Sequence, residues 1–334
     1  MSSSLKGTTI LVTGATGFSG SLLVEKLVSV GARVTAIHRR DNIPEKLSQL
    51  PVRWLKGEVY DPEVVRQACA EVEYIFHLAA AYRTAGIKDE IYRKVHLDST
   101  QLLAAEALNQ PSFKRFVHIS TVGVHGHIET IPADETAPFN PGDVYQVTKT
   151  ESEQWIRQFA IERDLPLTVI RPAAIYGPGD RRLLKIFRMA KLPLVPILGF
   201  SAGYYHLIHV EDFTDCLILV AHHPASLGEV FICGNKTPVR FKDMVRIIAG
   251  ELGRHPLFIR LPAWPFFVLG WLCEGICRPL GLEPPIYRRR VAFFTKDRAF
   301  DTSKLHTQLG FTGRYDNEQG LSEVCRWYLS KGWL

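Results

Sequence analysis

A glycine-spaced turn near the N-terminus constrains the fold of this chain more than any other feature. Residues 9–13 form a β-branched run typical of a strand, and Gly14, Gly17 and Gly20 follow it. Apolar residues at helical spacing then predict a helix over 21–30. Glycines at this spacing allow a tight turn, a backbone that can approach a pyrophosphate, and a close helix–strand contact. Since a helix N-terminus also attracts anions, the stretch predicts a dinucleotide-binding turn.

Strands and helices alternate through the first half of the 334 residues. This alternation predicts an α/β fold, a Rossmann-type doubly wound parallel sheet. Expected strands cover 33–37, 52–55, 74–78, 115–119 and 167–170, and the longest expected helices cover 90–107 and 148–162. We assign residues 1–175 to the dinucleotide-binding domain, with later strands from 205–235. Residues 176–334 form a smaller, mostly helical C-terminal substrate-binding region.

The end of the second strand bears on the choice of cofactor. In such folds an acidic residue there accepts hydrogen bonds from the ribose of NAD, whereas an arginine pairs with the 2′-phosphate of NADP. His38 stands where the acid would be, and Arg39 and Arg40 follow it. The sequence therefore favours NADP, with NAD as the alternative and a solvated basic turn as the simplest other interpretation.

Composition narrows the classes of partner. The net charge of +6 is modest, and the short basic clusters lie far apart without interleaved aromatics, which argues against a nucleic-acid partner. Six scattered cysteines show neither a disulfide framework nor zinc spacing, so reduced thiols are expected. The first seven residues lack the apolar core of a signal peptide, and we expect a cytoplasmic protein without a metal.

Residues 261–278 have the most unusual composition. The segment from Leu261 to Cys273 is uncharged and mostly apolar, yet it is shorter than the roughly twenty residues that span a bilayer. Three interpretations stand: a buried helix, the wall of an apolar substrate pocket, or a peripheral membrane contact supported by Arg288–Arg290. Core or pocket is the favoured expectation.

Tyr145 and Lys149 lie one helical turn apart and share a helix face. An ordinary phenol has a pKa near 10, and a neighbouring ammonium favours the phenolate, so Tyr145 is a candidate acid/base. Ser120 or Thr121, at the end of the preceding strand, offers a hydroxyl to hold a substrate oxygen. His206 and His209 suggest a metal, but positions three apart on a strand point to opposite faces and do not converge.

These pieces together resemble the extended short-chain dehydrogenases/reductases, the group of NAD-dependent epimerases/dehydratases and 3β-hydroxysteroid dehydrogenases. The resemblance covers nearly the whole chain. It rests on residues 13–20, 77–80, 118–121, 145–149 and 171–178, with later landmarks at 209–212 and 300–304.

The resemblance implies a role for each matching residue. The hydroxyl role falls on Thr121, the acid/base on Tyr145, and the ribose-binding lysine on Lys149. The implied cofactor-binding residues are Gly14, Thr16, Gly17, Phe18, Ser19, Gly20, His38, Arg39, Glu58, Val59, Leu78, Ala79, Ala80, Tyr145, Lys149, Pro172, Ala174 and Ile175. It also implies a homodimer formed through the helices at 90–107 and 148–162.

The chain departs from the family pattern in two places. His96 stands where members carry an asparagine that supports a structural water relay, although a histidine also forms hydrogen bonds. Val122 and Gly123 replace the acidic pair of the sugar 4,6-dehydratases, which argues against dehydration.

Three functions remain in view. The first is an NAD(P)-dependent oxidoreductase that interconverts a secondary alcohol and a ketone on a hydrophobic small molecule, steroid-, isoprenoid- or flavonoid-like; Arg39 and the apolar 261–273 stretch favour it. The second is a nucleotide-sugar 4-epimerase with tightly bound NAD, in which Arg181, Arg182 or Arg260 would grip a diphosphate. The third, a non-catalytic regulator, is disfavoured by the intact Thr121, Tyr145 and Lys149.

Overall fold

A seven-stranded parallel sheet organises the chain in the computed structural model, which describes residues 4–39, 41–81, 88–199, 203–277, 282, 284, 291, 295 and 297–334. The strands follow the order β3-β2-β1-β4-β5-β6-β11, and the chain reverses direction across the sheet between β1 and β4. They are β1 (Thr9–Thr13), β2 (Arg33–His38), β3 (Val52–Lys56), β4 (Tyr74–His77), β5 (Arg115–Ile119), β6 (Leu167–Pro172) and β11 (Val230–Cys233). The expected doubly wound α/β fold is confirmed.

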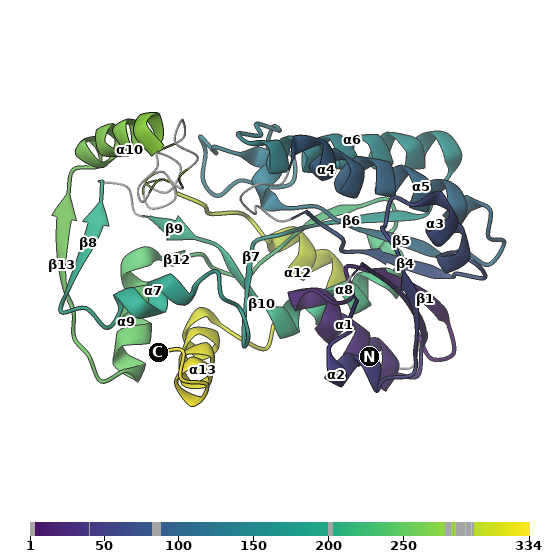
Figure 1. Ribbon diagram of the computed structural model, residues 1–334, viewed down its shortest axis with the longest axis horizontal. Helices are drawn as coiled ribbons and strands as arrows, with labels where there is room; N and C mark the ends of the chain where they lie inside the picture. Colours follow the sequence, from purple (N-terminus) through teal and green to yellow (C-terminus); the bar gives the residue numbers. More distant parts are fainter. Residues whose placement is uncertain are drawn as a thin grey trace.

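Helices cover both faces of the sheet (Figure 1). One face packs against α1 (Phe18–Ser29), α8 (Val210–His222) and α12 (Ser303–Leu309). The other packs against α3 (Pro62–Ala68), α4 (Asp89–Arg93), α5 (Ser99–Leu108) and α6 (Val144–Arg163), and the short α2 (Glu45–Ser48) precedes β3. Every residue of β4, β5 and β6 is buried, as expected for strands covered on both sides.

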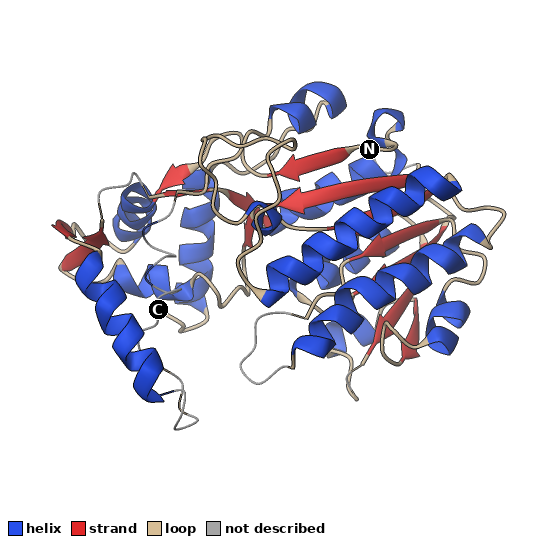
Figure 2. Ribbon diagram, turned by 90° about the horizontal axis from the view of Figure 1, so that it is seen from above, coloured by secondary structure: helices blue, strands red, loops and turns tan. Residues whose placement is uncertain are grey.

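The C-terminal region has its own apolar core around α7 (Leu184–Met189), α9 (Phe241–Glu251) and α13 (Asn317–Ser330). Three two-stranded sheets accompany these helices: β7 (Ala174–Tyr176) with β10 (Leu207–His209), β9 (Tyr204–Tyr205) with β12 (Val239–Arg240), and β8 (Leu194–Leu198) with β13 (Leu257–Leu261). Another helix of this region, α10 (Trp264–Cys277), lies on its outside (Figures 1 and 2).

More of the second half of the chain contacts the main sheet than the sequence indicated. Of the late strands expected within 205–235, β11 extends the main sheet beside β6, but β10 pairs with β7 outside it. Residues 303–311 also pack on the main sheet, because Leu305, Leu309 and Phe311 bury their side chains in the same core as α1. The segment 303–311 therefore belongs with the sheet, although the sequence placed it in the substrate-binding region.

Three helix predictions need correction. The first helix begins at Phe18 rather than at 21, so that Gly20 lies in its first turn. The expected helix over 90–107 contains a π-helical segment at Lys94–Asp98 between α4 and α5. The sequence also predicts a helix over 181–191, whereas α7 is shorter and covers Leu184–Met189.

For residues 261–273 the favoured expectation is core or pocket wall, and the core interpretation is wrong for most of α10. Within this helix only Gly270 and Glu274 are buried, while Trp264 and Trp271 are 68% and 60% exposed. The sequence shows that this segment is apolar, but it does not show which face of the helix is covered by another element. Arg278, the last residue of the predicted membrane contact, and Arg288–Arg290, which would support that contact, lie outside the described residues.

A buried ion pair fixes α6 against β6. The Arg171 guanidinium donates to both carboxylate oxygens of Glu153, with an Nη2–Oε1 distance of 2.5 Å, and both side chains are almost wholly buried. Ser120 also donates to Glu153 Oε2 at 2.5 Å. The pair therefore joins α6, β6 and the end of β5 at the edge of the sheet.

We predict that Glu153→Gln lowers the free energy of unfolding by about 3–5 kcal/mol, because it leaves the buried Arg171 charge without its counterion. Urea denaturation of the purified protein measures this change. Glu162→Gln, on the same helix, is the matched control: Glu162 is exposed and accepts a hydrogen bond from the exposed Gln158, and the change is expected to cost less than about 0.5 kcal/mol. Equal costs for the two variants would contradict the role given to the buried pair.

Candidate active site

The glycine-spaced turn folds back on itself between β1 and α1. Gly14 has a φ of +70°, and a Cβ on it would lie 2.9 Å from backbone atoms of Leu78 and Ala79. A Cβ on Gly20 would lie 2.1 Å from the Gly14 carbonyl oxygen, so the helix can approach the strand only with glycine there. Gly17 is the N-cap of α1 and is exposed, and within the described residues no side chain caps this helix. These features fit a cradle for a cofactor pyrophosphate, as the sequence predicts.

Buried hydrogen bonds hold the turn against the end of β4. The Ala79 amide donates to Thr13 Oγ1 at 3.1 Å, and Thr13 Oγ1 lies 2.8 Å from His77 Nδ1. Ser99, which donates to the Val95 carbonyl, lies 3.2 Å from His77 Nε2. Burial lowers the pKa of His77 to about 3, so the ring is neutral and links β1, β4 and α5 without a charge.

The adenosine end of the predicted site contains an ion pair that the sequence did not indicate. His38 ends β2, is buried, and packs edge-on against Trp54 with ring centroids 5.8 Å apart. Arg39 is exposed beside it, and Arg40 lies outside the described residues. In the parallel register Lys56 of β3 lies opposite His38, and its ammonium is 2.9 Å from Asp41. Lys56 was not predicted as a site residue, because only the strand register brings it beside His38.

The remaining predicted cofactor residues lie at the same edge of the sheet, past the carboxyl ends of their strands. Glu58 and Val59 follow β3, whose end is tied to β2 by a hydrogen bond from the Gly57 amide to the His38 carbonyl. Leu78, Ala79 and Ala80 follow β4, and Pro172 ends β6. Ala174 is exposed and Ile175 half-buried in β7; Thr16, Phe18 and Ser19, at the start of α1, are also half-buried.

Helix α6 carries Tyr145 and Lys149. Asp143 caps this helix by accepting a hydrogen bond from the Gln146 amide at 3.0 Å, which places the candidate acid/base in the first turn. Lys149 is buried and donates to the Ile119 carbonyl at the end of β5 at 2.9 Å. Burial lowers its pKa to about 8, and the nearby Glu153 opposes that shift. The helix thus brings one ammonium to the predicted site.

The two candidate hydroxyls after β5 have different surroundings. Ser120 is buried and its hydroxyl donates to Glu153, so it serves the ion pair behind the site. Thr121 is half-buried and accepts a hydrogen bond from the Gly123 amide at 3.0 Å. Of the two, Thr121 is the hydroxyl that can face a ligand.

His96 occupies the π-helical segment and ties it to the site. The Ala81 amide donates to His96 Nε2 at 3.1 Å, so Nδ1 carries the proton and donates to Thr148 Oγ1 at 2.8 Å. Burial, with a smaller contribution from the Lys149 charge, lowers the pKa of His96 to about 2. The neutral histidine therefore connects the segment after β4 to α6 directly, at a position where the family carries an asparagine.

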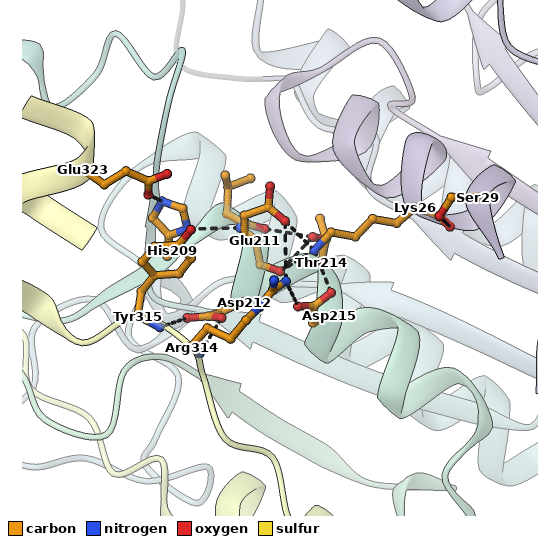
Figure 3. Close-up of polar contacts among 11 residues, drawn as sticks. Lys26, Ser29, His209, Glu211, Asp212, Thr214, Asp215, Arg314, Tyr315 and Glu323 are labelled. Carbon is orange, nitrogen blue, oxygen red and sulfur yellow. Dashed lines mark hydrogen bonds and ion pairs between the residues drawn. The ribbon is translucent and has the colours of Figure 1, made fainter. Parts of the chain in front are cut away.

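His206 and His209 bond to different groups at the seam of the two regions. His206 accepts from the Phe300 amide and lies 2.6 Å from the Asn235 carbonyl oxygen. His209 Nε2 lies 3.1 Å from Glu323, beside the ring of Tyr315 (Figure 3). Among the described residues no cluster of three or more His, Cys, Asp or Glu side chains could hold a metal.

Next to His209, charged side chains join the first helix to the C-terminal region (Figure 3). Lys26 of α1 pairs with Glu211 and Asp215 of α8 at 2.8 and 2.6 Å, and Arg314 also pairs with Asp215. Asp212 accepts from the backbone amides of Arg314 and Tyr315. Residues 209–212, which resemble a family motif, thus contact both α1 and residues 314–315. The sequence pattern alone does not reveal this role.

Comparisons with known proteins agree with this geometry. The sequence profile of the NAD dependent epimerase/dehydratase family matches residues 10–234. The chain is 26% identical to the decarboxylating sterol-4-alpha-carboxylate 3-dehydrogenase of Saccharomyces cerevisiae, over 95% of this chain and 97% of the relative. It is 27% identical to the 3 beta-hydroxysteroid dehydrogenase/Δ5→4-isomerase of Mycobacterium tuberculosis, over 96% and 90%.

A solved structure shows the same fold. The NAD complex of dTDP-glucose 4,6-dehydratase from Bacillus anthracis superposes with a TM-score of 0.76 at 20% identity, and the match covers 97% of each chain. The chain therefore belongs to the NAD-dependent epimerase/dehydratase family of extended short-chain dehydrogenases/reductases, and it is an NAD(P)-dependent enzyme.

Proposed function

We propose that this enzyme interconverts a secondary alcohol and a ketone on a hydrophobic small molecule, with NADP as the exchanged cofactor. The observation that carries the proposal is the placement of Lys149, buried one helical turn after Tyr145 and bonded to the end of β5, the strand that Thr121 follows. Thr121 follows β5 and Lys149 bonds to the end of β5, so this hydroxyl and this ammonium both belong to the carboxyl end of one parallel strand, and such strand ends are the usual site of ligands in open α/β sheets.

Each of the three residues has a distinct role in the proposal. A nicotinamide cofactor, when bound, supplies or accepts the hydride. Thr121 holds the substrate oxygen, and Tyr145 gives the proton to that oxygen or removes it. Lys149 favours the phenolate form of Tyr145 through its positive charge and contributes to holding the ribose. Positioning these groups on α6 and on the end of β5 fixes their geometry before the substrate binds.

Charge at the end of β2 and β3 supports NADP over NAD. Arg39 is exposed beside the buried His38, and Lys56 lies in register with His38 on the neighbouring strand. A 2′-phosphate would pair with the exposed Arg39 there, and Lys56, whose ammonium lies 2.9 Å from Asp41, is a second cation nearby; the acid that binds the ribose of NAD is replaced by His38. The epimerase alternative would instead require NAD to stay bound through each turnover.

The proposed substrate class rests on the activities for which two relatives, the sterol-4-alpha-carboxylate 3-dehydrogenase and the 3 beta-hydroxysteroid dehydrogenase, are named. Those two proteins are named for a sterol carboxylate and a hydroxysteroid, both large apolar alcohols or ketones. The C-terminal region of this chain is also rich in apolar residues around α9, α10 and α13. A hydrophobic ketone is therefore the first substrate class to screen.

We predict that the protein binds NADPH at least about tenfold more tightly than NADH, and that Arg39→Ala removes most of this preference, because a charge-assisted hydrogen bond to the 2′-phosphate is lost. Fluorescence titration with both cofactors measures the ratio. Arg33→Ala, which removes an exposed arginine at the opposite end of the same strand, is the matched control and leaves the ratio unchanged. NAD that co-purifies and resists dialysis would contradict the proposal and favour the epimerase.

We predict that Tyr145→Phe lowers kcat for ketone reduction by about a hundredfold or more, since the variant cannot transfer a proton to the substrate oxygen. Steady-state kinetics measure kcat, and NADPH titration shows whether the cofactor still binds. Tyr204→Phe removes a hydroxyl that accepts hydrogen bonds from exposed Arg240, and we expect its kcat to be within about twofold of wild type. Similar kcat values for the two variants would exclude Tyr145 as the acid/base.

We also predict a pH dependence set by Lys149. Because burial lowers its pKa from 10.5 to about 8, raising the pH through that region removes the proton and the positive charge. kcat/KM for ketone reduction should therefore fall above pH 8. In Lys149→Arg the guanidinium stays protonated, so the fall moves to higher pH even if the maximal rate is lower. An unchanged midpoint in that variant would show that Lys149 does not control the profile.

A further inference from the structure

Helix α10 turns its apolar face outward. Its exposed positions are all apolar or glycine: Trp264, Val268, Leu269, Trp271, Leu272, Gly275 and Ile276. At 100° per residue these positions cover nearly half of the helix circumference. Its one charged residue, Glu274, is buried. A surface helix of a globular protein has the opposite pattern, with its charged residues toward solvent.

The exposure is large enough to need a partner. Trp264, Trp271 and Ile276 are each at least 60% exposed, and Leu257, on the strand that leads into the helix, is 71% exposed. Contiguous apolar surface of this kind marks a site that binds a protein or a membrane. α10 lies on the outside of the C-terminal region, at the end of the molecule remote from the main sheet (Figures 1 and 2).

We propose that the outward face of α10 docks on the surface of an anionic phospholipid bilayer. Three observations favour lipid over a second protein. The exposed side chains of this face offer a partner only the two indole N–H groups, and a protein interface usually carries a polar rim. Its two tryptophans are the residues that prefer the membrane–water interface. The protein carries a net charge of +6, with Arg254 and Arg260 exposed just before the helix.

The helix is suited to lie on a bilayer rather than to cross it. Its 14 residues span about 21 Å, less than the roughly 30 Å of a bilayer core. In the described part of the chain no helix is both long and apolar enough to cross a membrane. Insertion of the outward face to the depth of its side chains, with the remaining domain in water, is the geometry of an interfacial contact.

Docking on a membrane would bring the enzyme to the place where a hydrophobic substrate collects. This part of the inference rests on that proposed function: a large apolar alcohol or ketone dissolves in the bilayer rather than in water. α10 belongs to the region that we assign to substrate binding, so docking would bring that region to the layer where such a molecule collects. The docking itself depends only on the exposed face and the charge around it.

Flotation of the full-length protein with vesicles tests the docking. We expect wild-type protein to float with vesicles of phosphatidylcholine and phosphatidylglycerol, and less with phosphatidylcholine alone. Leu272→Glu puts a charge at the centre of the exposed face and should lower the partition coefficient roughly tenfold or more. Ile161→Glu, a charge at a 77% exposed apolar site on α6, is the matched control and should float like wild type.

Three results would overturn the proposal: no flotation of the wild type, equal losses in both variants, or full binding by Leu272→Glu.

Sedimentation velocity without vesicles tests whether a second copy of the chain binds the exposed face of α10 instead of a membrane. A dimer that Leu272→Glu dissociates while vesicle binding persists would make this face a contact between copies of the chain. Circular dichroism shows that each variant is folded. Reduction of a water-soluble ketone without vesicles tests the proposed function separately, so that either proposal can fail alone.

Discussion

The close approach of the first turn to the end of β4 is the constraint on which the site depends. Gly14 lies where a Cβ would contact the backbone of Leu78 and Ala79, and Gly20 lies where one would contact Gly14. The hydrogen bond from Ala79 to Thr13 holds the two strand ends together. The start of α1 thus lies at the point where the chain reverses direction across the sheet, where such folds bind dinucleotides.

Electrostatics around α6 follow from the same close packing. His77, His96 and His118 are buried near Lys149, and burial, helped by the Lys149 charge, lowers the pKa of each imidazole. Lys149 is therefore the cation of this interior. One turn later, Glu153 is fully engaged by Arg171 and Ser120. α6 therefore carries the Lys149 ammonium on the side of the site, while the Glu153 carboxylate is neutralised by Arg171 behind the site.

Local sequence patterns predicted much of the fold and most of the residues proposed for the candidate site. The glycine turn, the alternation of strands and helices, and the Tyr145–Lys149 spacing are visible because each depends on residues close together in sequence. Lys56 was missed because its position beside His38 depends on the register of two strands. The π-helical segment at His96 and the pairing of β10 with β7 likewise depend on tertiary contacts. The exposed face of α10 was not predictable, because an apolar composition does not tell which side of a helix is covered.

A single-turnover reaction with deuterated NADPH tests the central claim most directly. The pro-R and pro-S forms, labelled at C4, would each be mixed with the enzyme and a hydrophobic ketone, and the alcohol product analysed by mass spectrometry. We predict that one of the two labels appears in the alcohol in stoichiometric amount and that NADP is released. A nucleotide sugar inverted at C4 by enzyme that retains its cofactor, with no alcohol formed from any ketone, would contradict the claim.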